Sequence, residues 1–235
     1  MKINNFSVAD RKGVIRALPQ NISDVNERRI RQFGAFMFLY DLIQEHWVRS
    51  RIHKADPAKH RQIMQGLIAP GKNATVLDMA CGTGGAIHHF DSSNDYTGLD
   101  ISYSMLSQAL KKARKKHFSS FRLVEGNAEE ALFEDQSFDF VLIDTALHMI
   151  PQYQKCMENV SRVLKTGGTL LVSCPTVGII QEFDALWEKI APKRHLNVLT
   201  EPTYRIFDTL IYDNLSNFSY SLWHCKNIRF QVESL

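Results

Sequence analysis

An acidic residue followed by a glycine-rich loop is the stretch of this sequence whose residue types and spacing could do chemistry. Asp78 ends a short apolar run, and Gly82, Gly84 and Gly85 follow it closely. The pattern predicts a buried parallel strand, a tight turn and the start of a helix. Glycines permit positive φ and carry no Cβ, so a ligand could lie directly against backbone N–H groups. We therefore expect a nucleotide-binding corner, although a tight connection without a ligand has the same pattern.

The spacing within this glycine loop narrows the choice of ligand. Gly82-Thr-Gly84-Gly85 is neither the G-x-G-x-x-G of dinucleotide folds nor the Gly-Lys-Ser/Thr of a P-loop, which disfavours a pyrophosphate or triphosphate. The carboxylate of Asp78 would repel a phosphate and attract a cationic amine. A second predicted strand ends in Asp100, whose carboxylate could accept hydrogen bonds from a ribose diol. The sequence thus predicts a ligand that carries a ribose and no phosphate.

Five motifs in the order of the chain resemble those of the class I S-adenosylmethionine (SAM)-dependent methyltransferases. The resemblance is closest to the group that includes ubiquinone and menaquinone C-methyltransferases, and it covers residues 76–173. The motifs are Val-Leu-Asp78-Met-Ala-Cys-Gly82-Thr-Gly84, Gly98-Leu-Asp100-Ile-Ser102-Tyr-Ser-Met105-Leu, Glu125-Gly-Asn127-Ala-Glu129, Ser137-Phe-Asp139-Phe-Val-Leu-Ile-Asp144 and Arg162-Val-Leu-Lys-Thr-Gly167-Gly168-Thr-Leu-Leu-Val.

The resemblance implies that the cofactor is SAM, with S-adenosylhomocysteine as its product, and it implies a role for each matching residue. Asp78 would lie near the methionine amino group, and Asp100 would bind both ribose hydroxyls. Asn127 would read the adenine amino group, but the family usually has Asp there, so a charge-assisted bond worth about 1 kcal/mol is lost. The other cofactor-binding residues that the resemblance implies are Ala80, Gly82, Gly84, Ile101, Met105, Ala128, Asp144 and Thr145.

Methyl transfer from a sulfonium is an SN2 displacement, which sets what the catalytic residues must do. They align the nucleophile with the methyl group, exclude water and, if needed, take a proton. Asp144 and His148 are candidates because they are four positions apart at the expected carboxyl edge of the sheet, where open α/β folds bind ligands. A similar Asp-x-x-x-His pair orients an amine in related N-methyltransferases. His148 could instead lie behind the site, without touching the substrate.

The elements that must hold these residues alternate between strand and helix, which predicts a doubly wound α/β fold. We expect a Rossmann-like sheet of seven mostly parallel strands whose last strand is antiparallel. Strands are predicted at 76–78, 96–100, 121–125, 138–143, 169–173, 218–225 and 228–233, with a hairpin turn at 226–227. Helices are predicted at 104–116, 154–164, 182–190 and 204–215, and His88 and His89 should lie on a helix after the glycine loop in a structural or solvent-facing role.

Residues 1–70 should form an N-terminal arm and a helical lid, and residues 71–235 the SAM-binding core, together one structural domain. Helical periodicity covers 24–48, and a second helix over 57–68 ends before Ala69-Pro-Gly71. Tyr40 is the third catalytic candidate, because many relatives carry a Tyr-Asp pair at this place. The aromatic residues of the segment could face a substrate or form ordinary core; they are Phe33, Phe36, Phe38, Tyr40 and Trp47.

Composition limits the class of protein. A chain of 235 residues with 44% hydrophobic residues can bury the core of one α/β domain. Its four cysteines form no C-x-x-C, there is no paired His spacing and no long apolar run, so we expect a reduced, cytoplasmic protein without a metal site or a membrane span. A net charge of +3 neither requires nor excludes a nucleic-acid surface.

The expected function is therefore methyl transfer to a small-molecule acceptor, at an amine, a phenol oxygen or an activated carbon. One alternative is an RNA or protein methyltransferase, which would need basic residues beside the pocket mouth, either at 111–116 or among Arg49, Arg51, Lys54 and Arg61. Another alternative is a SAM-binding subunit that has lost the transfer reaction. A nucleic-acid partner is not expected, and the aromatic C-terminal strands leave a homodimer open.

Overall fold

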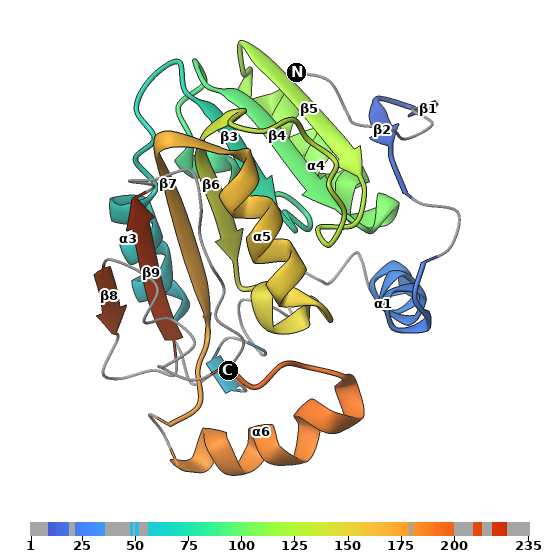
Figure 1. Ribbon diagram of the computed structural model, residues 1–235, viewed down its shortest axis with the longest axis vertical. Coiled ribbons are helices and arrows are strands. Elements are labelled where there is room, and N and C mark those ends of the chain that lie inside the picture. Colours follow the sequence, from blue (N-terminus) through green and yellow to red (C-terminus); the bar gives the residue numbers. More distant parts are fainter. Residues whose placement is uncertain are drawn as a thin grey trace.

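The core of the protein is one sheet with helices on both faces (Figure 1). The computed structural model describes residues 9–18, 22–35, 48, 50, 51, 56–178, 181–199, 209–212 and 218–224. Their strands run in the order β1-β2-β5-β4-β3-β6-β7-β9-β8. The strands are β1 (Ala9–Arg11), β2 (Val14–Arg16), β3 (Thr75–Met79), β4 (Asp95–Asp100), β5 (Ser120–Glu125), β6 (Phe138–Asp144), β7 (Leu164–Pro175), β8 (Thr209–Tyr212) and β9 (Phe218–His224).

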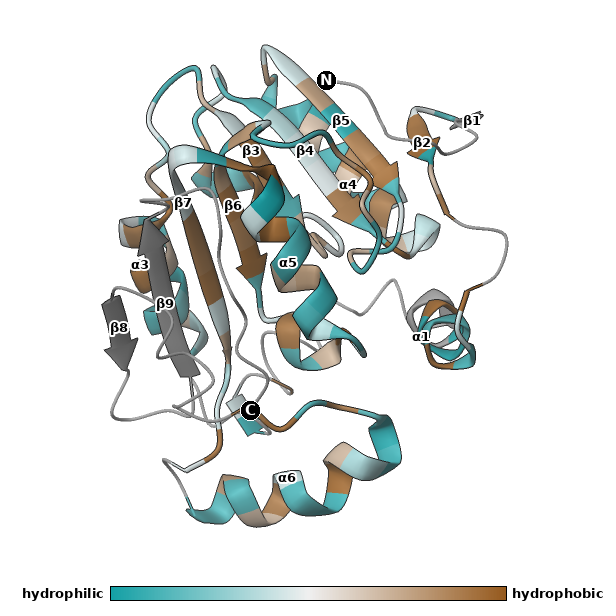
Figure 2. Ribbon diagram, viewed as in Figure 1, coloured by the Kyte–Doolittle hydropathy of each residue, from teal (hydrophilic) through white to brown (hydrophobic). Residues whose placement is uncertain are grey.

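The five central strands are parallel, as the alternation of strand and helix predicts. Most residues of β3 and β6 are hydrophobic (Figure 2), because strands that are covered on both faces bury most of their side chains. Val76 of β3 belongs to one buried cluster and Leu77 to the other, so successive residues feed opposite faces of the sheet. The carboxyl ends of β3, β4, β5 and β6 therefore meet at one edge.

The helices divide between the two faces. They are α1 (Asp24–Ala35), α3 (Pro57–Leu67), α4 (Tyr103–Lys116), α5 (Tyr153–Val163) and α6 (Gln181–Arg194). Residues of α3 and α4 pack into the cluster that contains Val76, whereas α5 packs into the cluster that contains Leu77. The Asp56 carboxylate caps α3 by accepting hydrogen bonds from two backbone N–H groups, and Pro57 occupies the first helical position. No helix in the described ranges is long and apolar enough to cross a bilayer.

The structure corrects two expectations about the edges of the sheet. The described residues form nine strands instead of seven, because β1 and β2 make a hairpin whose second strand pairs in parallel with β5. The helix predicted at 204–215 is wrong where it is described: β8 is a strand antiparallel to β9, which is antiparallel to β7. Its Thr-Leu-Ile-Tyr sequence suits a pleated strand that has a partner. The predicted strand at 228–233 and the turn at 226–227 lie outside the described residues.

A third correction concerns the connection from β3 to β4. The expected helix after the glycine loop is only one turn of 3-10 helix, η3 (Ile87–His89), between stretches of turn. Parallel strands are usually joined by a full crossover helix. This connection lines the cavity described next, together with residues of α3 and α4.

Candidate active site

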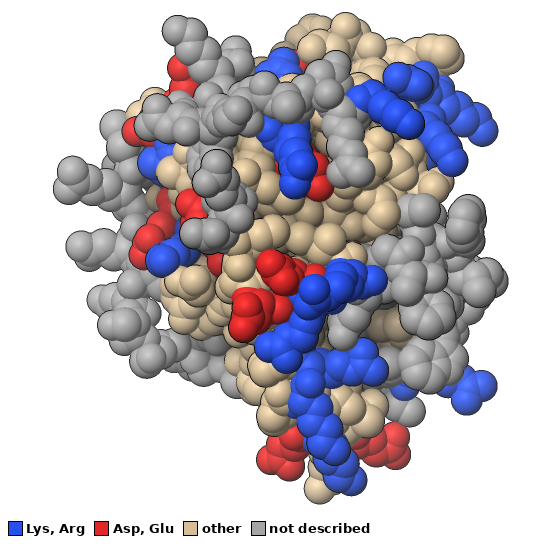
Figure 3. All heavy atoms as spheres, turned by 90° about the vertical axis from the view of Figure 1, so that its right-hand side faces the viewer, with Lys and Arg blue, Asp and Glu red and all other residues tan. Residues whose placement is uncertain are grey.

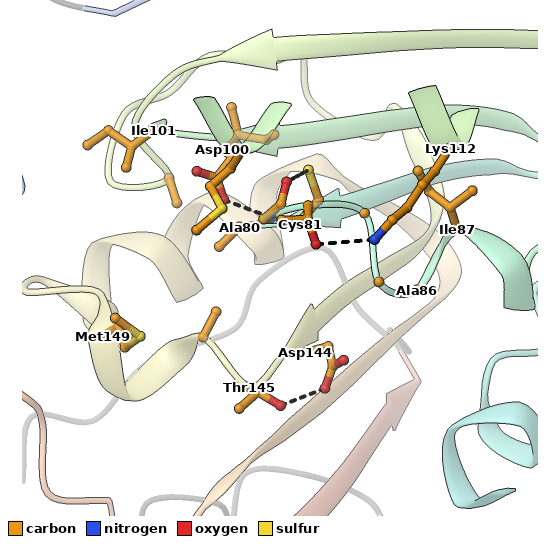
Figure 4. Close-up of a pocket in the computed structure, with 18 of the residues that line it drawn as sticks. Ala80, Cys81, Ala86, Ile87, Asp100, Ile101, Lys112, Asp144, Thr145 and Met149 are labelled. Atoms are coloured by element: carbon orange, nitrogen blue, oxygen red, sulfur yellow. Dashed lines mark hydrogen bonds between the residues drawn. The ribbon is translucent and has the colours of Figure 1, made fainter. Parts of the chain in front are cut away.

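A cavity of about 740 Å³ opens at the carboxyl edge of the central strands. Its walls come from α1, α3, the glycine loop, α4 and the segments that follow β5 and β6; Figure 4 shows part of this lining. Most of the sequence-predicted cofactor residues lie in this lining: Ala80, Gly82, Gly84, Asp100, Ile101, Met105, Asn127, Ala128, Asp144 and Thr145. Neither Asp78 nor His148 is among the described lining residues, and Tyr40 lies outside the described part of the chain.

Both the backbone conformation and the packing of the loop require a glycine at position 84. Its φ is +75°, and a Cβ added there would lie 2.5 Å from Cδ1 of Ile87 and 3.1 Å from Cβ of Ala109 on α4. Its N–H donates to the Cys81 carbonyl at 2.8 Å, which closes the turn. The loop can therefore pack against α4 only without a side chain at this position.

Replacing Gly84 by alanine should lower the free energy of unfolding by about 2–4 kcal/mol, because positive φ and overpacking both act against it. Gly85→Ala is the matched control, since no heavy atom lies within 4 Å of the added Cβ and Gly85 lacks a positive φ. Urea unfolding of the three proteins measures the difference. Equal losses in both variants would contradict this account.

Asp100 ties the end of β4 to the glycine loop (Figure 4). Its Oδ2 accepts the Gly82 N–H and its Oδ1 accepts the Ser102 N–H, both at 2.8 Å. Burial raises the pKa of this carboxyl to about 6, against the opposing effect of these hydrogen bonds. Because each carboxylate oxygen has a second lone pair, the group can still accept two ligand hydroxyls.

Asp78 lies beneath the cavity. Its side chain is buried, and Oδ2 accepts a 2.8 Å hydrogen bond from the Tyr96 hydroxyl. Burial raises the pKa of Asp78 to about 7, although the Tyr96 hydrogen bond acts in the opposite direction. The structure thus gives Asp78 a partner within the fold, and its contact with a ligand amine stays a prediction.

The raised pKa of Asp78 makes stability depend on pH. Between about pH 4 and pH 7 the folded state holds a proton that the unfolded state releases, so the free energy of unfolding falls as pH rises through this window. Asp78→Asn keeps an acceptor for Tyr96 and cannot ionise. Relative to wild type, it should gain on the order of 3 kcal/mol between pH 4 and pH 8. Denaturant titrations at both pH values measure this, and an unchanged pH dependence would contradict the assignment.

The substitution of Asn for the expected Asp at position 127 has a local reason. Asn127 Nδ2 donates to Oε2 of Glu129 at 3.2 Å, and Asn127 Oδ1 accepts the Glu129 N–H at 3.1 Å. A carboxylate in place of the amide would face the carboxylate of Glu129 at this distance and be repelled. The amide oxygen keeps one lone pair for a ligand amino group.

Asp144 receives several polar groups at the end of β6. Its Oδ1 accepts hydrogen bonds from the hydroxyls of Ser173 and Thr145, and Nε2 of His60 lies 3.4 Å from the same oxygen. His60 belongs to the buried face of α3 and lines the cavity. The structure therefore brings an imidazole to Asp144, but from α3.

His148, the imidazole that the sequence pairs with Asp144, lies elsewhere. It is buried on η4 (Leu147–Met149), and its ring lies 5.6 Å from that of Trp187 on α6. Burial, and then the charge of Arg29, lower the pKa of His148 to about 3, which keeps the ring neutral. The structure places His148 behind the cavity wall, and a role in catalysis stays a prediction.

Comparison with known proteins agrees with this geometry. Residues 70–211 match the family model described as "Methyltransferase domain". The chain belongs to this family. Its fold is that of the class I SAM-dependent methyltransferases.

Two curated relatives and one solved structure illustrate the similarity of this methyltransferase to known proteins. It is 33% identical over 142 residues to a demethylmenaquinone methyltransferase of Listeria welshimeri, with 57% of this chain and 60% of the relative covered. It is also 33% identical to the Bacillus licheniformis protein of that name, with 63% of each covered. The chain thus spans about 60% of the length of these relatives. A Haemonchus contortus phosphoethanolamine N-methyltransferase 2 shares the fold at 20% identity and a TM-score of 0.61, with 79% and 43% covered.

The site of this methyltransferase fits SAM on its own geometry. The glycine loop packs too tightly for a side chain at Gly84, Asp100 presents two anchored carboxylate oxygens, and Asn127 presents an amide oxygen at the same cavity. His60 and Arg29 are two polar lining residues that sequence reasoning missed. Arg29 is buried on α1, three positions after the buried Asn26, and His60 is buried on α3, four positions before the buried Met64. Their helical spacing was visible in the sequence, but their burial was not.

Proposed function

We propose that this methyltransferase transfers the methyl group of SAM to a small-molecule acceptor bound in the same cavity. One observation carries the proposal: the cavity is lined both by the cofactor residues at the ends of β4 and β5 and by Asp144 with His60 beside β6. Bound SAM supplies an electrophilic methyl group. The names of the demethylmenaquinone methyltransferase relatives also support an acceptor of small-molecule size.

In this proposal Asp144 and His60 prepare the acceptor nucleophile. The Asp144 carboxylate is held by Ser173 and Thr145, so it is oriented before the ligand arrives. A carboxylate in this position stabilises an imidazolium, so His60 can hold a proton taken from an amine or a phenol. For an activated carbon acceptor, the same pair would orient an oxygen of the ring.

We propose further that residues 1–70 act as arm and lid over residues 71–235. Two contacts support this: Asn26 and Arg29 of α1 line the cavity, and Arg29 Nη2 donates to the His195 carbonyl at 2.7 Å, at the end of α6. The helix thereby connects the cavity to the segment that follows β7. Tyr40 remains a proposed acceptor contact.

An RNA or protein acceptor is the second candidate, because one of its conditions is met. Arg61, Lys112, Lys115 and Lys116 line the cavity. The distribution of charge argues against an extended nucleic-acid surface. On the face shown in Figure 3 the basic side chains form separate groups, and acidic side chains lie beside the lower group. The salt dependence of RNA binding tests for an RNA acceptor, since several phosphate contacts make RNA affinity fall steeply with ionic strength.

Isothermal titration with SAM and S-adenosylhomocysteine is the experiment that tests the proposed function. We expect micromolar binding of both. A panel of amines, phenols and quinone precursors, assayed for release of S-adenosylhomocysteine, then identifies the acceptor. A folded protein that binds neither compound would contradict the proposal.

A further inference from the structure

Between α3 and the C-terminal half of α4 the cavity continues past His60, and no role proposed above for SAM or for proton transfer uses its α4 side. Along this part of the cavity the connection from β3 to β4 contains only η3 and turns, where parallel strands are usually joined by a full crossover helix. Pro57, His60, Arg61 and Met64 bound it on the α3 side, and the C-terminal half of α4 bounds it on the other. The chain therefore leaves room beside the glycine loop for a group that is not the adenosine.

Basic side chains gather on this part of the lining. We call them the basic wall: Arg61, His88, His89, Lys112, Lys115 and Lys116. Lys112 reaches from α4 to the glycine loop, where Nζ lies 3.3 Å from Oγ1 of Thr83 (Figure 4). Lys116 Nζ donates to the backbone carbonyl of His88 at 3.1 Å. Two elements far apart in the sequence are thus joined along one wall.

The charged lining residues come mostly from different elements. The acidic ones, Asp100, Glu129 and Asp144, all lie at or after the ends of β4, β5 and β6. The basic wall comes from α3, η3 and the C-terminal half of α4, where Lys112 and Lys116 are half-buried. The charge of Arg29 on α1 instead interacts with that of Glu129, and the charge of Asp144 acts on His89 at one end of the wall. The pKa of His88 is lowered first by desolvation and then by the charges of Lys116, Lys112 and Arg61. Three cations therefore act on one point of the wall.

We propose that the basic wall binds an anionic group, a phosphate or a carboxylate, carried by the methyl acceptor. This inference rests on the proposed function, because it names the acceptor class of the same cavity. Lys ammonium and Arg guanidinium groups make charge-assisted hydrogen bonds to such anions. Because Lys112 and Lys116 are half-buried, less water surrounds them, and their electrostatic attraction for an anion is stronger than at a fully exposed site. The acceptor thus lies with its anion on the wall and its nucleophile toward Asp144.

Titration of the SAH-saturated protein with inorganic phosphate, and separately with acetate, tests this at constant ionic strength (SAH is S-adenosylhomocysteine). We expect saturable binding of at least one of them. Lys112→Gln/Lys116→Gln should weaken it at least about tenfold. Lys111→Gln/Lys155→Gln is the matched control, because it removes the same charge from exposed positions outside the cavity lining. The control should bind the anion as wild type does, and SAM affinity should be equal in all three proteins.

Four results would overturn the inference. Absence of saturable anion binding would show that the wall holds no anion, and equal weakening in both double variants would leave only a general effect of charge. Anions that compete with SAH, together with weaker SAM binding by Lys112→Gln/Lys116→Gln, would assign the wall to the methionine carboxylate of the cofactor. Salt-dependent RNA binding that the same variant abolishes, without phosphate binding, would assign it to nucleic acid. Failure of wild type to bind SAM or SAH would instead contradict the proposed function.

Discussion

Asp100→Ala should weaken SAM binding by about 2–3 kcal/mol, or roughly 30- to 160-fold in Kd. The variant loses two acceptor oxygens at the cavity, and it also releases the Gly82 and Ser102 N–H groups that Asp100 holds at 2.8 Å. The glycine loop would therefore lose its anchor to β4 as well as its ligand contacts. Isothermal titration with SAM and SAH measures the loss.

The control for Asp100 is Asp135→Ala, which removes an exposed carboxylate that pairs with Arg162 away from the cavity. It should leave SAM affinity unchanged. Thermal unfolding of both variants separates a lost contact from a lost fold. Wild-type affinity in a folded Asp100→Ala protein would mean that the cofactor site is misplaced.

His60→Gln and His60→Ala should lower kcat by about 10²–10⁴-fold on the acceptor found by the panel, while SAM affinity stays within about twofold of wild type. Glutamine can still donate a hydrogen bond to Asp144 but cannot take up a proton. The fall in kcat of His60→Gln therefore reports proton transfer and not packing. The limb of the pH–rate profile that belongs to this imidazole should disappear in both variants. An exposed histidine provides the control, since His117→Asn keeps a residue that tolerates positive φ at the end of α4.

His148→Ala is the decisive companion variant. The Asp-x-x-x-His spacing predicts that it lowers turnover with SAM affinity nearly intact, and the contact of His148 with Trp187 predicts a loss of stability instead. If His148→Ala loses turnover at wild-type stability while the His60 variants keep their turnover, the catalytic pair is Asp144 with His148. If the His60 variants lose turnover and His148→Ala loses only stability, the pair is Asp144 with His60.

The parallel centre of the sheet was predictable because its signal is local. Short apolar runs that end in Asp78, Asp100 and Asp144 alternate with helical periodicity, and each becomes a central strand. The edges carried no such signal. Thr-Leu-Ile-Tyr at 209–212 is compatible with helix or strand, and its pairing with β9 determined the outcome.

The motif residues could be assigned to one cavity from the sequence because parallel strands end at one edge, which brings the ends of β3, β4, β5 and β6 together whatever the details of packing. Asp78 departs from this pattern, since its side chain is directed to Tyr96 on the neighbouring strand. Whether a residue near the end of a strand faces a ligand or the core depends on the pleat and the twist, which spacing alone does not specify.

By itself, then, the sequence determined the α/β class and the cluster of glycine loop, Asp100 and Asn127, because each depends on residues close together in the chain or on the common end of the strands. SAM as the cofactor was predicted from the resemblance of the motifs to a known family. Only the tertiary structure decided that His60 reaches Asp144, that His148 lies behind the wall, and that Arg61 and Lys112 share one cavity. The physical reason is that these arrangements depend on how the helices pack on the sheet, through contacts between residues far apart in the chain.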